Sequence, residues 1–294
     1  MRSETLVLNA EAVRSPCYGG VRIERLNLRI HRGELVALFG PSGSGKSLLL
    51  ALLAGDVALE GGLLESVDPA TMPELPQGRA LRTTTAESLV RRYASSWTRA
   101  IYLLEVLGLG EVMEVPLSEL SDGQRGLLRV GCALAQNSAL YLLDDPLDYA
   151  DFERRRRLWA ELDDRCRFGS AVLLTTRDPA VARRADRVVL LDRGRLIADD
   201  TPQRLLQGLN ATRIEVEVEN PDTVLPMLEG VELRVYEASD GYRLTLYAPD
   251  TLALKLLQMG YGQVRAVQVH EPDLADAWQW FHLQHRGNPP KIVE

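Results

Sequence analysis

Short apolar runs alternate with helix-like stretches along residues 1–206. Residues 35–39 form an apolar run that ends at Gly40, as expected for a buried parallel strand. Similar runs predict three more strands, at residues 140–143, 172–174 and 187–191. Helical periodicity predicts helices at residues 46–53, 86–107, 124–136 and 152–165. Strands that alternate with helices predict an α/β domain with a parallel sheet.

The pattern changes after Leu206. Residues 212–219 alternate apolar and acidic side chains, which predicts a half-buried strand. We then expect a helix at 222–228, strands at 231–236 and 242–247, a helix at 250–259, a strand at 264–270 and a helix at 273–284. The order βαββαβ is that of the ferredoxin-like arrangement. The chain is therefore expected to have two domains, residues 1–206 and a small α+β domain at 207–294, with a linker at 207–211.

Composition and charge are those of a folded protein in a reducing compartment. The 294 residues are 46% hydrophobic and 26% charged, which excludes a disordered or fibrous chain. The net charge of −7 disfavours bulk nucleic-acid binding, and no nucleic-acid partner is expected. Three widely spaced cysteines form neither a disulfide framework nor a zinc motif. No signal core or bilayer-spanning stretch is found, so we expect a cytoplasmic protein that reaches a membrane only through a partner.

The segment after the first parallel strand carries a phosphate-binding motif. It reads Gly40-Pro41-Ser42-Gly43-Ser44-Gly45-Lys46-Ser47 and matches the pattern G-x-x-x-x-G-K-[ST]. Glycines let backbone N–H groups turn inward around a polyphosphate, and the following helix N-terminus adds partial positive charge. Lys46 is expected to reach the β- and γ-phosphates, and Ser47 to bind Mg²⁺. The motif predicts nucleotide phosphate binding but identifies neither the nucleotide nor a hydrolytic activity.

Two downstream motifs resemble those of the ABC ATPases. Residues 120–124 resemble the LSGGQ signature, with Asp122 in place of the first glycine, and an Ala-rich helix follows. Residues 140–146 resemble the Walker B strand of that family, which usually ends in Asp-Glu-Pro, where this chain has Asp144-Asp145-Pro146.

Four further positions fit the same family in the same order. Asp151 lies at the spacing of the D-loop aspartate, and residues 173–178 resemble the switch strand, with Arg177 where the family has His. Gln77 fits the Q-loop, and Tyr18 fits the aromatic residue that stacks on adenine. The resemblance implies a P-loop NTPase fold over residues 4–206, with a helical subdomain at about residues 86–120.

The resemblance also implies a role for each matched residue. Tyr18 would stack on adenine, Asp144 would bind Mg²⁺, and Gln77 would sense the metal. The signature residues would contact the γ-phosphate held by a second nucleotide-binding subunit; they are Ser121, Asp122, Gly123 and Gln124. Each role has a structural alternative: a core aromatic for Tyr18, a strand-end turn for Asp144, a plain loop for Gln77 and an N-cap for Ser121.

Three positions depart from the family pattern. Asp145 stands where the family has the general-base Glu, with a side chain one methylene shorter. Arg177 cannot accept a proton, although it can pair with a γ-phosphate. The two changes predict a site that binds ATP and hydrolyses it slowly or not at all; the alternative is a slow working site with Asp145 as base. Asp122 either points away from the partner's phosphate or caps its helix.

The function implied by the resemblance is that of an ATP-binding subunit of an ABC transporter, similar to ABC-2 exporters. Two such subunits, identical or paralogous, would sandwich ATP and Mg²⁺, and closure of the dimer would act on polytopic membrane subunits at the cytoplasmic face of the membrane. One alternative is a non-hydrolysing regulatory or scaffold subunit of an asymmetric complex. Another is a soluble ABC ATPase outside transport. Whether this chain's own site hydrolyses ATP stays open.

Two clusters of side chains outside these motifs also carry expectations. The arginine run at residues 154–157 is expected on a solvated helix face. Four ring side chains lie close together on the last helix, Trp278, Trp280, Phe281 and His282. At 3.6 residues per turn they cannot all face one side, so at least one is expected to be exposed or at an interface.

Overall fold

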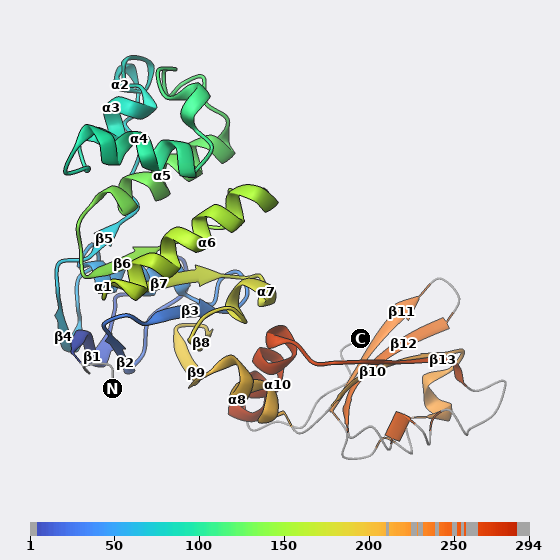
Figure 1. Cartoon of the computed structure of the whole chain (residues 1–294). Coiled ribbons are helices and arrows are strands. Elements are labelled where there is room, and N and C mark those ends of the chain that lie inside the picture. Colours follow the sequence, from blue (N-terminus) through green and yellow to red (C-terminus); the bar gives the residue numbers. More distant parts are fainter. Residues whose placement is uncertain are drawn as a thin grey trace. The chain divides into compact units, whose positions relative to one another are not determined.

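The computed structural model describes residues 5–209, 212–224, 228, 232–238, 241–248, 252–253, 256 and 264–286 (Figure 1). The chain divides into two compact units, Met1–Asp199 and Asp200–Glu294. We expected the boundary after residue 206. The division after Asp199 places helix α8 (Pro202–Gln207) in the second unit instead.

The first unit contains a six-stranded sheet in the order β5-β6-β7-β3-β8-β9. Its strands are β3 (Leu35–Phe39), β5 (Ala70–Thr71), β6 (Leu140–Leu143), β7 (Ala171–Thr176), β8 (Arg187–Asp192) and β9 (Arg195–Asp200). β3 pairs in parallel with β7 and β8, and β6 pairs in parallel with β5 and β7. All residues of β3 are buried, because both faces of a central parallel strand are covered. The four predicted strands are confirmed.

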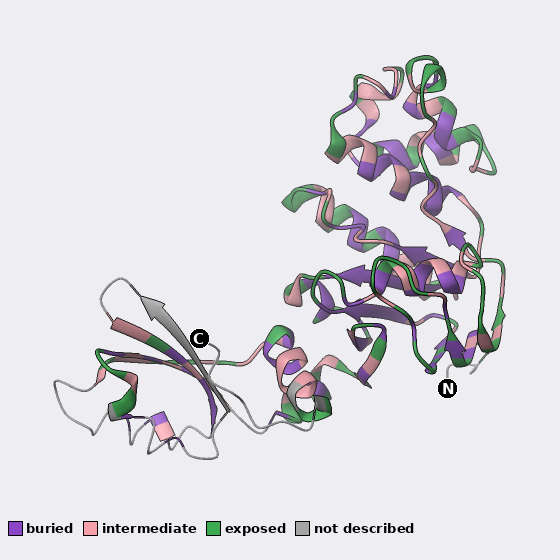
Figure 2. Ribbon diagram, turned by 180° about the vertical axis from the view of Figure 1, so that it is seen from behind, coloured by how far each residue is buried: buried purple, intermediate pink, exposed green. Residues whose placement is uncertain are grey.

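A second, antiparallel sheet has the order β2-β1-β4, with β1 (Leu6–Arg14), β2 (Leu26–His31) and β4 (Gly61–Ser66). One hydrophobic cluster joins side chains of this sheet, such as Leu8, to Leu38 of β3, Leu52 of helix α1 (Lys46–Ala54) and Leu142 of β6. Figure 2 shows that the central strands of the six-stranded sheet are almost wholly buried. The cluster fixes α1, and therefore the loop before it, at the end of β3.

The remaining elements of the first unit are mostly helical. They are α2 (Arg79–Thr83), α3 (Ala86–Arg91), α4 (Trp97–Val106), the 3-10 helix η1 (Gly110–Val112), α5 (Asp122–Ala135), α6 (Phe152–Arg167) and α7 (Pro179–Ala182). The prediction of one helix over residues 86–107 is wrong. Ser96 is extended and its hydroxyl accepts a hydrogen bond from the Arg99 N–H at 3.2 Å, so a new helix begins at Trp97.

The second unit contains a four-stranded sheet in the order β11-β12-β10-β13, in which neighbouring strands pair antiparallel. Its elements are β10 (Thr212–Val218), the 3-10 helix η2 (Pro221–Thr223), β11 (Glu232–Ala238), β12 (Gly241–Ala248), β13 (Val264–His270) and α10 (Leu274–Arg286). The expected strands are confirmed. Residues 225–227 of the first expected helix and most of the expected helix at 250–259 lie outside the described residues, so the ferredoxin-like arrangement stays a prediction.

The aromatic cluster on α10 is partly exposed. The rings of Trp278 and His282 stack with their centroids 4.8 Å apart, one helical turn from each other. Trp280 and Phe281 are half-buried as well. Across the described ranges, no helix combines the length and the apolar character that crossing a membrane requires.

Candidate functional site

Three loops meet at one edge of the six-stranded sheet. β6, β7 and β3 are neighbours, and their carboxyl ends lie at the same edge because they are parallel. The motif loop follows β3, Asp144 and Asp145 follow β6, and Arg177 follows β7. In open α/β sheets this edge is where ligands bind. The strand order therefore brings together residues that the sequence separates widely.

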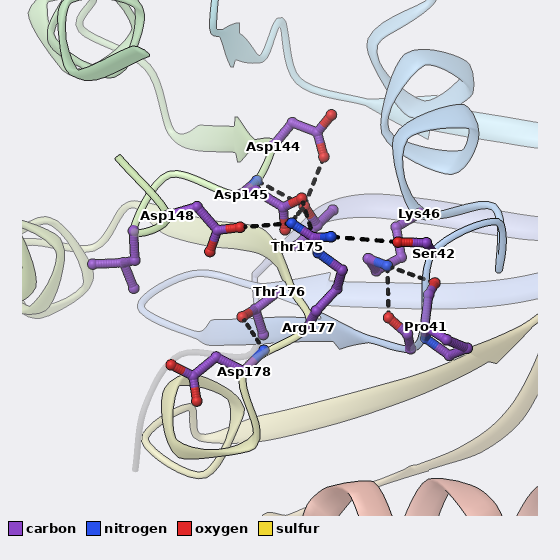
Figure 3. A network of polar contacts seen from close by, with 12 residues as sticks. Pro41, Ser42, Lys46, Asp144, Asp145, Asp148, Thr175, Thr176, Arg177 and Asp178 are labelled. Atoms are coloured by element: carbon purple, nitrogen blue, oxygen red, sulfur yellow. Dashed lines mark hydrogen bonds and ion pairs between the residues drawn. The ribbon is translucent and has the colours of Figure 1, made fainter. Parts of the chain in front are cut away.

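The motif loop folds around its own lysine. Lys46 is buried, and its ammonium donates hydrogen bonds to the carbonyl oxygens of Gly40 at 2.6 Å and Pro41 at 3.0 Å (Figure 3). Burial lowers the pKa of Lys46, while the carboxylates of Asp145 and Asp144 oppose that shift. Gly45 has φ +101°, a conformation that L side chains rarely adopt, and it begins α1. A cation and a helix N-terminus thus face the same loop.

A buried hydroxyl in this loop has no protein partner. Ser44 is 2% exposed, and its Oγ makes no hydrogen bond to any described residue. Buried polar groups are normally hydrogen-bonded, so an unpartnered hydroxyl beside a buried lysine suits a loop that receives a polar ligand. Backbone amides, the Ser44 hydroxyl and the Lys46 ammonium are all hydrogen-bond donors. This donor set fits phosphate oxygens, which act as acceptors.

The turn between β8 and β9 supports the loop from behind. The Gly194 N–H donates to the Ser44 carbonyl at 2.7 Å, and the Glu24 N–H donates to the Gly194 carbonyl at 3.1 Å. Gly194 has φ +79°, and a Cβ there would lie 1.8 Å from the Arg22 carbonyl oxygen. This close approach could not be predicted from the sequence, because it depends on how the two segments pack.

Tyr18 lies on a two-residue hairpin beside the loop. Tyr18 and Val21 exchange backbone hydrogen bonds of 2.8 and 2.9 Å. The Val21 side chain lies 3.1 Å from where a Cβ of Gly45 would be, so the hairpin is adjacent to the motif loop. The Tyr18 side chain is 51% exposed and does not belong to the core. Its stacking on adenine stays a prediction.

A buried threonine organises the two aspartates after β6. The Thr175 hydroxyl donates to Asp144 Oδ1 at 2.6 Å and accepts from the Asp145 N–H at 2.8 Å (Figure 3). Asp145 has φ +44°, a left-handed conformation that Asp tolerates better than most residues. Burial raises the pKa of Asp145, and the nearby carboxylates of Asp144 and Asp148 raise it further. A carboxylate with a raised pKa is a better base than an ordinary one.

Arg177 crosses the space between the motif loop and residues 144–148, which we call the acidic turn (Figure 3). Its Nη1 donates to Ser42 Oγ at 3.3 Å, and its Nη2 donates to Asp148 Oδ2 at 3.0 Å. Its Nε lies 4.0 Å from Asp145 Oδ2. Hydrogen bonding to Asp148 and the charge of Asp145 raise the pKa of Arg177. Sequence reasoning missed Asp148, although three acidic residues within positions 144–148 were a signal for an acidic turn.

The arginine run on α6 is not wholly solvated, and that expectation is wrong for two of its members. Arg155 donates through Nε to the carbonyl oxygens of Leu147 at 3.0 Å and Ala150 at 3.1 Å. Its Nη1 donates to Asp178 at 3.2 Å. Arg154 pairs with Asp151 at 2.9 Å. The reason is that the first turn of α6 packs beside the acidic turn and the end of β7.

The other predicted residues lie at, or just before, the first turns of helices. Ser121 and Gln124 form a capping box, with bonds of 3.2 and 2.9 Å, so the N-cap alternative for Ser121 holds. The Asp122 side chain is fully exposed and pairs with Arg125 at 3.3 Å; Gly123 follows it in the first turn of α5. Asp151 caps α6, Gln77 is exposed before α2, and Ser47 is exposed in the first turn of α1. Their nucleotide-binding roles stay predictions.

The arrangement defines a P-loop nucleotide-binding domain, with a parallel strand, a glycine loop around a buried lysine and a helix. Comparison with known proteins narrows this class. The model of the family described as "ABC transporter" matches residues 23–148. The hemin import ATP-binding protein HmuV of Rhodopseudomonas palustris (strain BisA53) is 31% identical over 251 residues, which cover 75% of this chain and 93% of that protein. This chain belongs to the ABC transporter ATP-binding protein family.

Two further matches bear on the extent of the likeness. The Nod factor export ATP-binding protein I of Sinorhizobium fredii (strain NBRC 101917 / NGR234) is 29% identical over 286 residues, covering 90% of this chain and 82% of that protein. That share is more than residues 1–206 alone can supply, so the match extends into the second unit. The solved "Structure of ATP binding subunit of ABC transporter" superposes with a TM-score of 0.61 at 23% identity, covering 69% of this chain and 92% of that chain. It shows the same fold.

Proposed function

We propose that this chain is an ABC transporter ATP-binding subunit whose own site holds ATP with Mg²⁺ and hydrolyses it slowly or not at all. Membership of the family implies ATP binding. Slow hydrolysis is supported mainly by the position of Arg177. Its guanidinium contacts both Ser42 and Asp148 and lies beside Asp145. A guanidinium stabilises a bound phosphate but cannot accept a proton.

The donor set also fits a magnesium ion. Asp144 supplies a carboxylate and Ser47 a hydroxyl, both hard oxygen ligands, with phosphate oxygens and water completing six positions. Within the described residues no group of three or more metal-ligating side chains forms a ready-made cage. Magnesium commonly binds in this way, through one or two protein ligands plus phosphates. When bound, it would offset phosphate charge; Thr175 keeps the Asp144 carboxylate oriented for it.

Asp145 supports the second candidate, a slow working site. Its raised pKa suits a general base, but its side chain is shorter than that of Glu by one methylene, and its left-handed backbone sets where the carboxylate lies. General-base catalysis depends first on distance, with heavy atoms about 2.6–3.2 Å apart. The two candidates differ in whether Asp145 reaches that range when nucleotide is bound.

The test uses the full chain and two restoring substitutions, Asp145→Glu and Arg177→His, alone and together. ATP binding is measured by titration with a fluorescent ATP analogue and Mg²⁺, and turnover by phosphate release. The native chain is expected to bind ATP saturably with little turnover. The turnover of the double variant is expected to rise at least about tenfold, a lower bound below the roughly 10²–10⁴-fold that general acid–base catalysis typically contributes. Arg184→His is the matched control, because Arg184 forms a similar exposed pair with Asp163 at 3.0 Å.

Two results would contradict the proposal. If the native chain turns over as fast as the double variant and Asp145→Asn abolishes turnover, Asp145 is a working base. If Lys46→Ala leaves ATP binding unchanged, the motif loop is not the nucleotide site.

Partners follow from the relatives. Proteins named as ATP-binding proteins of hemin import and Nod factor export are similar to this chain. We infer a second nucleotide-binding subunit, identical or paralogous, polytopic membrane subunits, and a place at the cytoplasmic face of the membrane. The match to the export protein covers 90% of this chain, against 75% for the hemin import protein, and this larger share supports an exporter-like system. Copurification of the tagged chain with membrane proteins from detergent extracts tests this.

A further inference from the structure

Arg177 and Asp148 form an ion pair across the opening of the motif loop. The pair joins Nη2 to Oδ2 at 3.0 Å, and both side chains are partly exposed. Nη1 of the same guanidinium is left to point at Ser42 of the motif loop. Because a guanidinium has five N–H donors in a fixed plane, it can keep Asp148 on one edge while it donates to a ligand on another.

The backbone around Asp148 is held in place. The Asp148 N–H donates to the Asp145 carbonyl at 3.1 Å. Arg155 binds the carbonyl oxygens of Leu147 and Ala150, on either side of Asp148. The next residue, Tyr149, packs so closely on α5 that a Cβ at Gly126 would lie 2.2 Å from its ring. Asp148 is therefore a preset acceptor on a fixed turn.

The backbone around Arg177 is held as well. The Asp178 N–H donates to Thr176 Oγ1 at 3.0 Å, and Thr176 is buried. The Asp178 side chain caps α7 and pairs with Arg155, the same residue that braces the Asp148 turn. The backbone on both sides of the Arg177–Asp148 pair is thus held by hydrogen bonds and packing. The long Arg177 side chain is the part that needs a partner to hold it.

We propose that Asp148 is a positioning residue that holds the Arg177 guanidinium over the motif loop, so that the pair distinguishes a nucleoside triphosphate from a diphosphate. A flexible side chain loses conformational entropy when a ligand fixes it, and Asp148 removes most of that loss before the nucleotide binds. In this proposal Nη1, which points at Ser42 of the motif loop, meets the terminal phosphate of a triphosphate, and a diphosphate lacks that group. The inference rests on the proposed function, since it assumes that ATP lies in this loop.

The experiment measures the ratio of ADP to ATP dissociation constants, with Mg²⁺, for the full chain and four variants. Asp148→Ala removes the acceptor, Asp148→Asn keeps an acceptor oxygen without the charge, and Arg177→Ala removes the guanidinium. The fourth combines Asp148→Ala with Arg177→Ala. Asp163→Ala is the matched control, because it removes an exposed Asp from another 3.0 Å ion pair.

Asp148→Ala is expected to weaken ATP binding about three- to fivefold, the upper part of the range for a partly exposed charged contact, and to leave ADP binding within about twofold. Asp148→Asn is expected to recover part of the loss. In the Arg177→Ala background, Asp148→Ala should have no further effect on the ratio. Asp163→Ala should leave both constants unchanged.

Two outcomes would overturn the inference. In one, Asp148→Ala tightens ATP and ADP binding equally, with or without Arg177, which means that Asp148 acts only as a repelling charge. In the other, the ratio does not change at all. The proposed function is tested separately by Lys46→Ala: if that variant loses ATP binding while Asp148→Ala does nothing, the nucleotide site stands and only the role of Asp148 fails.

Discussion

A buried carboxylate on α6 connects the helical layer to the strand before the acidic turn. Glu161 is 5% exposed and accepts hydrogen bonds from Arg165 Nε at 3.0 Å, from the Tyr102 hydroxyl at 3.2 Å and from Arg99 Nη2. Arg165 in turn donates to the hydroxyl of Tyr141 on β6 at 2.5 Å. Replacing Glu161 leaves two arginines without their shared partner.

The expected cost of Glu161→Ala follows from this geometry. Breaking a buried ion pair by removing one partner costs about 3–5 kcal/mol, because the remaining charge stays desolvated. The Arg165 and Arg99 side chains are 16% and 27% exposed, so water relieves part of the penalty. We expect a loss of about 3 kcal/mol in the free energy of unfolding of the first unit. Glu153→Ala, on the same helix but in exposed ion pairs, should cost much less, because solvent screens those pairs.

The assay is urea unfolding, monitored by tryptophan fluorescence. The chain has four tryptophans, of which Trp97 and Trp159 lie in the first unit. Replacing Trp278 and Trp280 by Phe makes the signal report that unit alone, which matters because two units need not unfold together. A cost for Glu161→Ala below about 1 kcal/mol, or no larger than that of Glu153→Ala, would refute the reasoning that a desolvated charge is left behind.

Two further predictions concern stability. Gly194→Ala should destabilise the first unit by at least about 2 kcal/mol in the same urea assay. The reason is that the new Cβ would lie 1.8 Å from the Arg22 carbonyl oxygen, at a left-handed φ. Unchanged stability would mean that the β8–β9 turn shifts freely. Burial raises the pKa of the Cys132 thiol from 9.0 to about 12. Between these pH values the folded state therefore binds more protons than the unfolded state. The free energy of unfolding should then fall by up to about 1.4 kcal/mol per pH unit as pH rises through that window. Cys132→Ala should lose this contribution to the slope of the urea midpoint against pH, and an identical slope would contradict it.

The parts of the site that depend on neighbours in sequence were predictable. The apolar run of β3, the glycine loop and the lysine all lie within residues 35–46, so the pattern itself carries their geometry. The capping box of Ser121 and Gln124 joins residues three apart, and the structure has it. The exception was the break before α4. Helical periodicity continued through Ser96, and the local competition of its hydroxyl for the Arg99 N–H decided otherwise.

Contacts between distant residues were decided by the tertiary structure alone. Arg177 is 135 positions from Ser42 and 29 from Asp148, and the three meet because β7 lies between β3 and β6 in the sheet. Likewise, the Arg22 carbonyl oxygen leaves no room for a Cβ at Gly194, and Arg155, from an arginine run that the sequence predicts to be solvated, pairs with Asp178 after β7. A sequence records which side chains are available, but hydrogen bonds and ion pairs act over a few ångströms. Which of those side chains meet depends on the spatial order of the strands in the sheet.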